Sequence, residues 1–165
     1  MKPLAERDIR LSFVNCTRGE VARAKLPAGL DQVPWPDLDF LGWRDPGAPE
    51  RAYLVAEHDG GLVGVALRAS SGRARNFAAR SMCSLCLTPH TAGGVALMTA
   101  RRTGAAGRQG NSVGQYLCTD LACSLYVRGR IVSAAAGDLD ETLSPDDKIA
   151  RTQANLDAFL DKVIR

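Results

Sequence analysis

The chain has 165 residues, of which 45% are hydrophobic and 24% charged, and its formal net charge at pH 7 is +3. A chain of this length buries enough apolar surface for one domain or two small ones. No stretch approaches the ~20 apolar residues that a membrane-spanning helix requires, and the first ten residues are too charged for the apolar part of a secretory signal. We therefore expect a cytoplasmic protein with no membrane association.

Positive charge is concentrated in the middle of the chain. Residues 68–130 contain nine arginines, no lysine and a single acidic residue, Asp120, whereas the two flanking segments together carry a net charge of −5. Such a basic block attracts an anionic partner, either nucleic acid or an acidic protein surface. The alternatives are a solvated arginine face and arginine counterions for a negatively charged metal site.

The first 50 residues are predicted to hold two short helices and a connector. Thr17 and Glu20 form a T-x-x-E capping box, so the second helix is expected to begin at Thr17 and to end near Leu26, before Pro27. Cys16 has no neighbouring cysteine and is interpreted as a small core residue. The connector that follows is rich in Pro and Asp, which disfavour a long helix or a central strand, and its two tryptophans are expected to anchor it to the core.

Two β-hairpins are expected in the middle of the chain. Residues 52–57 and 62–68 have the composition of strands and flank a His-Asp-Gly-Gly turn, in which His58 is interpreted as a solvated residue. Residues 95–101 and 113–118 flank a glycine-rich segment, which we expect to form a long mobile tip. This segment lacks the G-x-x-x-x-G-K-[ST] pattern of a phosphate-binding loop.

Four of the five cysteines form two local pairs, Cys83 with Cys86 and Cys118 with Cys123. In a reducing compartment such pairs are more often metal ligands than disulfides, and two pairs of thiolates on tight turns can supply the tetrahedron that Zn²⁺ adopts. A knuckle, a hairpin and a helix that carries the last ligand together describe a treble-clef zinc finger over residues 80–130. All four metal positions would be closed, so the predicted role of the zinc is structural.

The same cysteines are compatible with other chemistry. Redox chemistry at one C-x-x-C pair would leave the second pair unexplained, whereas an iron–sulfur cluster is compatible with four cysteines but fits two short pairs less well than zinc. His90 could replace a cysteine as a ligand, but four sulfurs suffice, so we expect it beside the site or at the surface. The sequence contains no catalytic triad, open metal site or paired carboxylates, and no enzymatic activity is expected.

Several motifs resemble those of a known family. They are Cys83-x2-Cys86, Cys118-x4-Cys123, the glycine-rich hairpin between them, and the stretches "GQYLCTDLACS", "SFVNCTRGE" and "DFLGWRD". The chain is similar to the elongation factor G-binding (FBP) family, which includes the FusB-type fusidic acid resistance proteins, and in particular to its short, actinobacterial-type members. Ser84 stands where the resistance proteins carry an aromatic contact residue.

The resemblance implies an N-terminal helical region and a C-terminal α/β domain with a four-cysteine zinc finger. It also implies a protein that is not an enzyme, that binds elongation factor G, and that helps to release the factor from ribosomes stalled by fusidic acid. The Zn²⁺ ligands implied here are Cys83, Cys86, Cys118 and Cys123. A ribosome-linked housekeeping role is the alternative to resistance.

We predict an α+β fold with N-terminal helices, a β-hairpin, a treble-clef zinc finger and a C-terminal helix. Residues 1–50 would form the helical region and connector, and residues 51–165 an α/β domain. Its last helix is expected to start at Ser144-Pro145, a good helix cap, and to present one apolar face.

We expect a monomer whose partner is elongation factor G. The alternative function is a zinc module that binds the ribosome or ribosomal RNA. Arginine suits acidic protein surfaces and phosphates equally, and exposed tyrosines can stack on either kind of partner. The predicted contact residues are Arg101, Arg102, Arg108, Tyr116, Tyr126 and Arg128.

Overall fold

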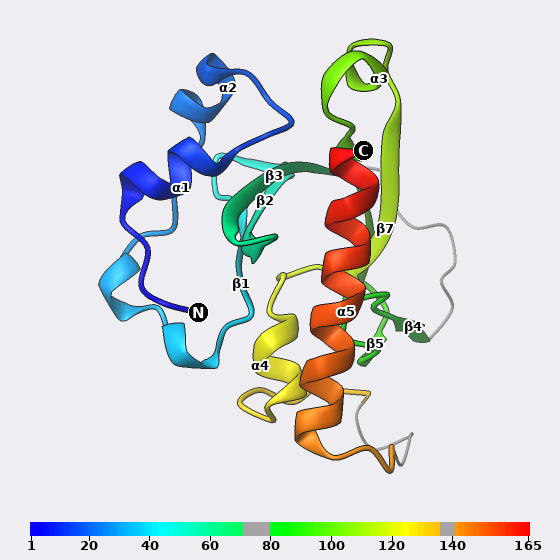
Figure 1. Cartoon of the computed structure of the whole chain (residues 1–165). Helices are drawn as coiled ribbons and strands as arrows, with labels where there is room; N and C mark the ends of the chain where they lie inside the picture. Colours follow the sequence, from blue (N-terminus) through cyan, green and yellow to red (C-terminus); the bar gives the residue numbers. More distant parts are fainter. Residues whose placement is uncertain (71–79, 136–140) are drawn as a thin grey trace.

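A five-stranded antiparallel sheet lies at the centre of the computed structural model, which describes residues 1–70, 80–135 and 141–165 (Figure 1). Its strands follow the order β1-β2-β3-β6-β7, and β4 and β5 pair separately. The bounds are β1 Phe40–Asp45, β2 Ala48–His58, β3 Gly61–Ala69, β4 Arg80–Met82, β5 Pro89–Thr91, β6 Val95–Arg101 and β7 Ser112–Cys118.

Helices cover both faces of this sheet, which confirms the α+β class. In Figure 1, α1 and α2 lie to one side of the strands, and the long red helix α5 runs along β7 on the other side. The bounds are α1 Glu6–Ser12, α2 Arg18–Arg23, α3 Gly104–Arg108, α4 Cys123–Val127 and α5 Pro145–Ile164, with short 3-10 turns at Leu30–Gln32 and Trp35–Asp37.

Alternation along β2 explains why there are two cores. Successive side chains of a strand point to opposite faces, so Leu54 joins the cluster beneath α5 and the zinc-finger cysteines, whereas Tyr53 and Val55 join the cluster beneath the N-terminal helices. β1 divides in the same way, with Phe40 on the first face and Trp43 on the second. Both faces of the sheet therefore carry buried side chains at β1 and β2.

The N-terminal predictions hold with one adjustment. The capping box at Thr17 and Glu20 is present, but the helix ends at Arg23, before the predicted end near Leu26. Both tryptophans are buried anchors, and the indole of Trp43 donates to the carbonyl of Lys25 at 2.9 Å. The connector also supplies the edge strand β1. Strand β2 spans residue 50. The division of the chain into residues 1–50 and 51–165 stays a prediction.

The first hairpin is confirmed, with a turn in which Asp59 (φ 48°) and Gly60 (φ 76°) are both left-handed, as a two-residue type I′ loop requires. The expectation that His58 is solvated is wrong, because 7% of its side chain is exposed and its ring contacts Asp157 of α5. That contact joins residues 99 positions apart, which a local pattern cannot reveal.

The second hairpin is also present, but its tip is not a long mobile loop. It contains α3 and is bound to the end of α5, because the amide of Thr103 donates to Val163 at 2.9 Å and its hydroxyl to Ile164 at 2.6 Å. The Arg102 guanidinium also donates to the carbonyl of Arg165 at 3.0 Å. This anchoring is not visible in the sequence, because Val163 of the helix end lies 60 residues after Thr103.

The predicted C-terminal helix begins at Pro145 with Ser144 as its cap, and it is amphipathic as expected. Its buried side chains, which pack on the sheet and the zinc finger, are Thr152, Leu156, Phe159, Leu160 and Val163. Across the described ranges, no helix combines the length and apolar character needed to cross a membrane.

Candidate metal centre

Four short elements position the cysteines. Cys83 follows β4 and Cys86 lies in the turn before β5, while Cys118 ends β7 and Cys123 begins α4. The turn of the first pair is closed by a hydrogen bond from the amide of Leu87 to the carbonyl of Cys83 at 3.0 Å. This order of knuckle, hairpin and helix is the predicted treble clef.

The four sulfurs converge at one buried point. All lie within 4.8 Å of one another, with 3.7 Å between the Sγ atoms of Cys83 and Cys123 and 3.5 Å between those of Cys86 and Cys118. A tetrahedron with Zn–S bonds of about 2.3 Å has edges of about 3.8 Å. The spacing of the sulfurs therefore fits a zinc ion, which would hold the knuckle to the hairpin and to α4.

The electrostatics of the cluster also favour a cation. Hydrogen bonds among the sulfurs lower the pKa of Cys83 and raise that of Cys123, so the four thiols cannot all ionise together without a positive charge between them. Cys16 lies apart, and burial raises the pKa of its thiol to about 11, which suits a neutral packing residue.

Two groups contact the sulfurs from outside the set of four. The amide of Leu85 donates to Cys83 Sγ at 3.4 Å, and His90 Nε2 lies 3.2 Å from Cys118 Sγ. His90 is buried and its ring packs edge-on against Tyr126 at 4.9 Å. Its place beside the site agrees with the expectation that four sulfurs suffice, and contacts of this kind orient the ligands and disperse their charge.

Helix α5 holds the knuckle, a contact that was not predicted from the sequence. Arg151 Nη2 donates to the carbonyl of Cys86 at 3.3 Å, and Asn155 Nδ2 donates to that of Leu85 at 2.9 Å. Arg151 also pairs with Glu141. The spacing of four residues places both donors on one side of the helix, but only the packing shows that this side meets the knuckle.

Arg128 was predicted to contact a binding partner. Its guanidinium instead binds Asp39 through both terminal nitrogens, at 2.6 and 2.8 Å. Tyr126, another predicted contact residue, donates its hydroxyl to Asp120 at 2.8 Å. Both side chains therefore have partners within the chain, and their role in binding another molecule stays a prediction.

The remaining predicted contact residues lie on the second hairpin and its tip. Arg101 and Arg108 are exposed, Arg102 is half-buried against the end of α5, and 41% of Tyr116 on β7 is exposed. The amide of Ser84 donates to the carbonyl of Tyr116 at 2.7 Å, so this tyrosine adjoins the zinc knuckle. The fold thus brings an exposed aromatic side chain to the metal centre.

Comparison with known proteins identifies this arrangement. The model of the FBP C-terminal treble-clef zinc-finger family matches residues 8–163, which include all four cysteines. The chain belongs to this family. Zn²⁺ is accordingly its cofactor, in agreement with the buried sulfur cluster. No curated protein matches the chain.

A solved structure shares the fold of this family member. The fusidic acid resistance protein FusC superimposes with a TM-score of 0.52 and 18% sequence identity, over 88% of this chain and 52% of that protein. The chain therefore spans about half the length of FusC. At this identity the likeness establishes a common fold.

Proposed function

We propose that this FBP-family protein binds elongation factor G through its zinc-finger half, without catalytic activity, and promotes release of the factor from the ribosome. The family match over residues 8–163 carries the proposal, because it covers the sheet, the metal centre and α5 together. The likeness of the fold to a fusidic acid resistance protein supports it.

The surface around the second hairpin suits a protein partner. Arg101 and Arg108 are exposed and can form paired hydrogen bonds with carboxylates. Nearer the zinc, Tyr116 and Met82 expose 41% and 46% of their surface. An apolar or aromatic centre with a charged rim is the usual composition of a protein interface.

The second candidate is a zinc module that binds ribosomal RNA. The nine arginines and single acid of residues 68–130 favour it, because arginines also neutralise phosphates. Binding to RNA would weaken steeply with rising salt, as counterions are released from each contacted phosphate. A protein interface with an apolar centre would lose less affinity.

Co-elution of the zinc-loaded protein with purified elongation factor G at near-physiological salt tests the first proposal, with the metal content measured on the same fractions. The triple variant Arg101→Glu, Arg102→Glu, Arg108→Glu is expected to weaken binding by at least about tenfold, since three charges are reversed at the rim, and to keep its zinc.

A matched control places the same charge change on the N-terminal helices, as Arg7→Glu, Arg18→Glu, Arg23→Glu, and should bind normally. If the two triple variants bind with equal affinity, the hairpin tip is not part of the interface. Absence of any complex with the wild-type, zinc-loaded protein would reject elongation factor G as the partner, and a salt-dependent complex with ribosomal RNA would then support the second candidate.

A further inference from the structure

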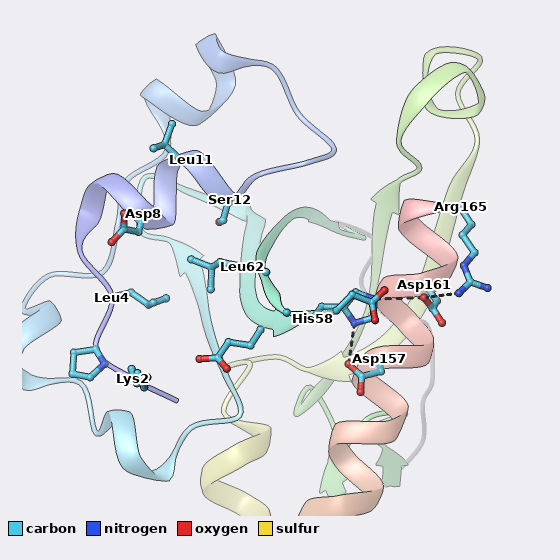
Figure 2. Close-up of a pocket in the computed structure, with 15 residues that line it drawn as sticks. Lys2, Leu4, Asp8, Leu11, Ser12, His58, Leu62, Asp157, Asp161 and Arg165 are labelled. Atoms are coloured by element: carbon cyan, nitrogen blue, oxygen red, sulfur yellow. Dashed lines mark hydrogen bonds and ion pairs between the residues drawn. The ribbon is translucent and has the colours of Figure 1, made fainter.

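A second cluster of ionisable side chains lies where the turn between β2 and β3 meets the last turns of α5 (Figure 2). His58 Nδ1 is 3.0 Å from Asp157 Oδ1, while its Nε2 is 3.4 Å from Asp161 Oδ1 and 3.8 Å from Asp59 Oδ2. A histidine with 93% of its side chain buried is thus surrounded by three carboxylates.

The unusual feature is the second ring nitrogen. Nε2 of His58 is buried and has no hydrogen-bond partner among the residues that the structure describes. A buried polar atom without a hydrogen bond is costly, and the contacts of Nε2 with Asp161 and Asp59 are ion pairs that do not supply one. The hydrogen bond with Asp157 orients the ring, so that Nε2 faces the carboxylate of Asp161 (Figure 2). The Asp59 carboxylate lies on the same side, at 3.8 Å from Nε2.

The geometry points to a second metal site, in which His58, Asp59 and Asp161 bind a divalent ion, Zn²⁺ in the first instance, independently of the four cysteines. Their ligand atoms lie within 4.8 Å of one another. Ligands about 2.05 Å from a tetrahedral zinc ion are about 3.3 Å apart, close to the distance between Nε2 and Asp161. Asp59 is on an exposed turn, so a small side-chain rotation completes the set.

Asp157 supports this assignment without binding the metal itself. A histidine that ligates a metal commonly donates its other N–H to a carboxylate, which fixes the tautomer and the orientation of the ring. Here Nδ1 can donate to Asp157, which leaves the lone pair of Nε2 for the metal. A mixed set of one imidazole and two carboxylates suits zinc and similar divalent ions.

The surroundings leave room for a cation with further ligands. The cluster borders a hollow of about 890 Å³, which is also lined by Lys2, Asp8 and Glu57. A metal bound there would keep a coordination position open to water, unlike the closed cysteine site. It would also tie the β2–β3 turn to α5, so binding should stabilise the folded chain.

One group competes with the proposed ion. Arg165 Nη2 lies 3.2 Å from Asp161 Oδ1, the same oxygen that faces His58. The Arg165 side chain is 77% exposed, so it can turn into solvent when a metal arrives. Removal of the Arg165 side chain should therefore tighten metal binding. If the cluster is only a set of ion pairs, the same change should give no gain in metal affinity.

The test is a titration of the protein, already loaded with one zinc per chain, with further Zn²⁺ by calorimetry. The hydrogen bond with Asp157 raises the pKa of His58, so protons compete with the metal and the titration is done near about pH 8. Wild type is expected to take up a second equivalent. Asp59→Asn and Asp161→Asn should weaken that step by at least about tenfold, and Asp157→Asn by about 10–100-fold.

Two controls test whether a variant is misfolded and whether the second ion binds at the cysteines. Arg165→Ala should bind the second ion about threefold more tightly, as expected for loss of a weak exposed ion pair, and Asp146→Asn, an exposed change in the first turn of the same helix, should leave it unchanged. With Co²⁺ as the probe, the second equivalent should add no thiolate-to-cobalt charge-transfer absorption, because no sulfur takes part.

Three results would overturn the assignment. They are uptake of one ion only by the wild type, an unchanged second step in Asp59→Asn and Asp161→Asn, and growth of the thiolate absorption with the second equivalent. None of them depends on whether the protein binds elongation factor G.

Discussion

Arg128 and Asp39 form an ion pair that joins the zinc finger to the start of the sheet. Their side chains are 17% and 3% exposed, and Gln153 of α5 adds a hydrogen bond to the same carboxylate at 2.9 Å. Burial opposes the ionisation of Asp39, but the hydrogen bonds from Arg128 and Gln153 outweigh it, and the pKa of Asp39 is lowered. The carboxylate is therefore charged at neutral pH and depends on both partners.

Arg128→Ala should consequently destabilise the protein by roughly 3 kcal/mol, because it leaves a charged carboxylate buried without its main partner. Arg130→Ala is the matched control: it removes the neighbouring pair with Asp37, in which the arginine is 61% exposed, and should cost less than about 1 kcal/mol. Urea unfolding measures both, and equal costs would show that burial does not distinguish the pairs.

At the scale of elements, β1 crosses the loop that carries two of the cysteines at very close range. A Cβ atom on Gly42 would lie 2.6 Å from Cβ and 2.9 Å from the carbonyl oxygen of Leu121. Leu121 itself is left-handed, with φ at 57°, and its amide donates to the carbonyl of Cys118 at 2.9 Å. The loop has little freedom to move away from the strand.

Gly42→Ala should therefore cost about 1–3 kcal/mol, the usual range for overpacking. Gly61→Ala makes the same change in a strand where the nearest atom to the new Cβ is 3.8 Å away, so it should fold with nearly wild-type stability. Thermal unfolding of the two zinc-loaded variants compares them. If Gly42→Ala is as stable as Gly61→Ala, the strand and the loop are looser than their separation indicates.

At the scale of the whole molecule, the metal centre and the sheet share one core. The four cysteines and Leu85 belong to the same buried cluster as strand residues such as Leu54 and helix residues such as Phe159. A zinc finger that is part of the core cannot open without exposing the apolar faces of the sheet and α5. Metal binding is therefore coupled to folding of more than the finger.

Removal of zinc should unfold the protein. Structural zinc contributes about 10–16 kcal/mol in zinc-finger peptides, which matches the total stability of a typical domain, about 5–15 kcal/mol. Chelation, or Cys123→Ser, is expected to abolish the near-UV circular dichroism of the buried tryptophans, whereas Cys16→Ser should keep it together with one zinc per chain. If the signal persists after complete metal removal, the core folds without the metal and the prediction is wrong.

Features that depend on neighbouring residues could be predicted from the sequence. Cysteine spacing, helix caps and the residues of a hairpin turn are local, because each follows from the geometry of one turn or helix. They sufficed to predict the treble clef, the helix from Pro145 and the hairpin at Asp59-Gly60. The motifs around Cys83 and Cys118 also sufficed for the family.

The side chains that meet across long stretches of the chain could not be predicted in this way. The ring of His58 is turned toward α5, Arg128 is committed to Asp39, and the hairpin tip is bound to Val163. Each pairing spans about 60 to 99 positions and results from how the sheet faces and α5 pack. A charged or polar residue looks alike in sequence whether it is solvated or paired, because its partner is chosen by packing and not by its neighbours along the chain.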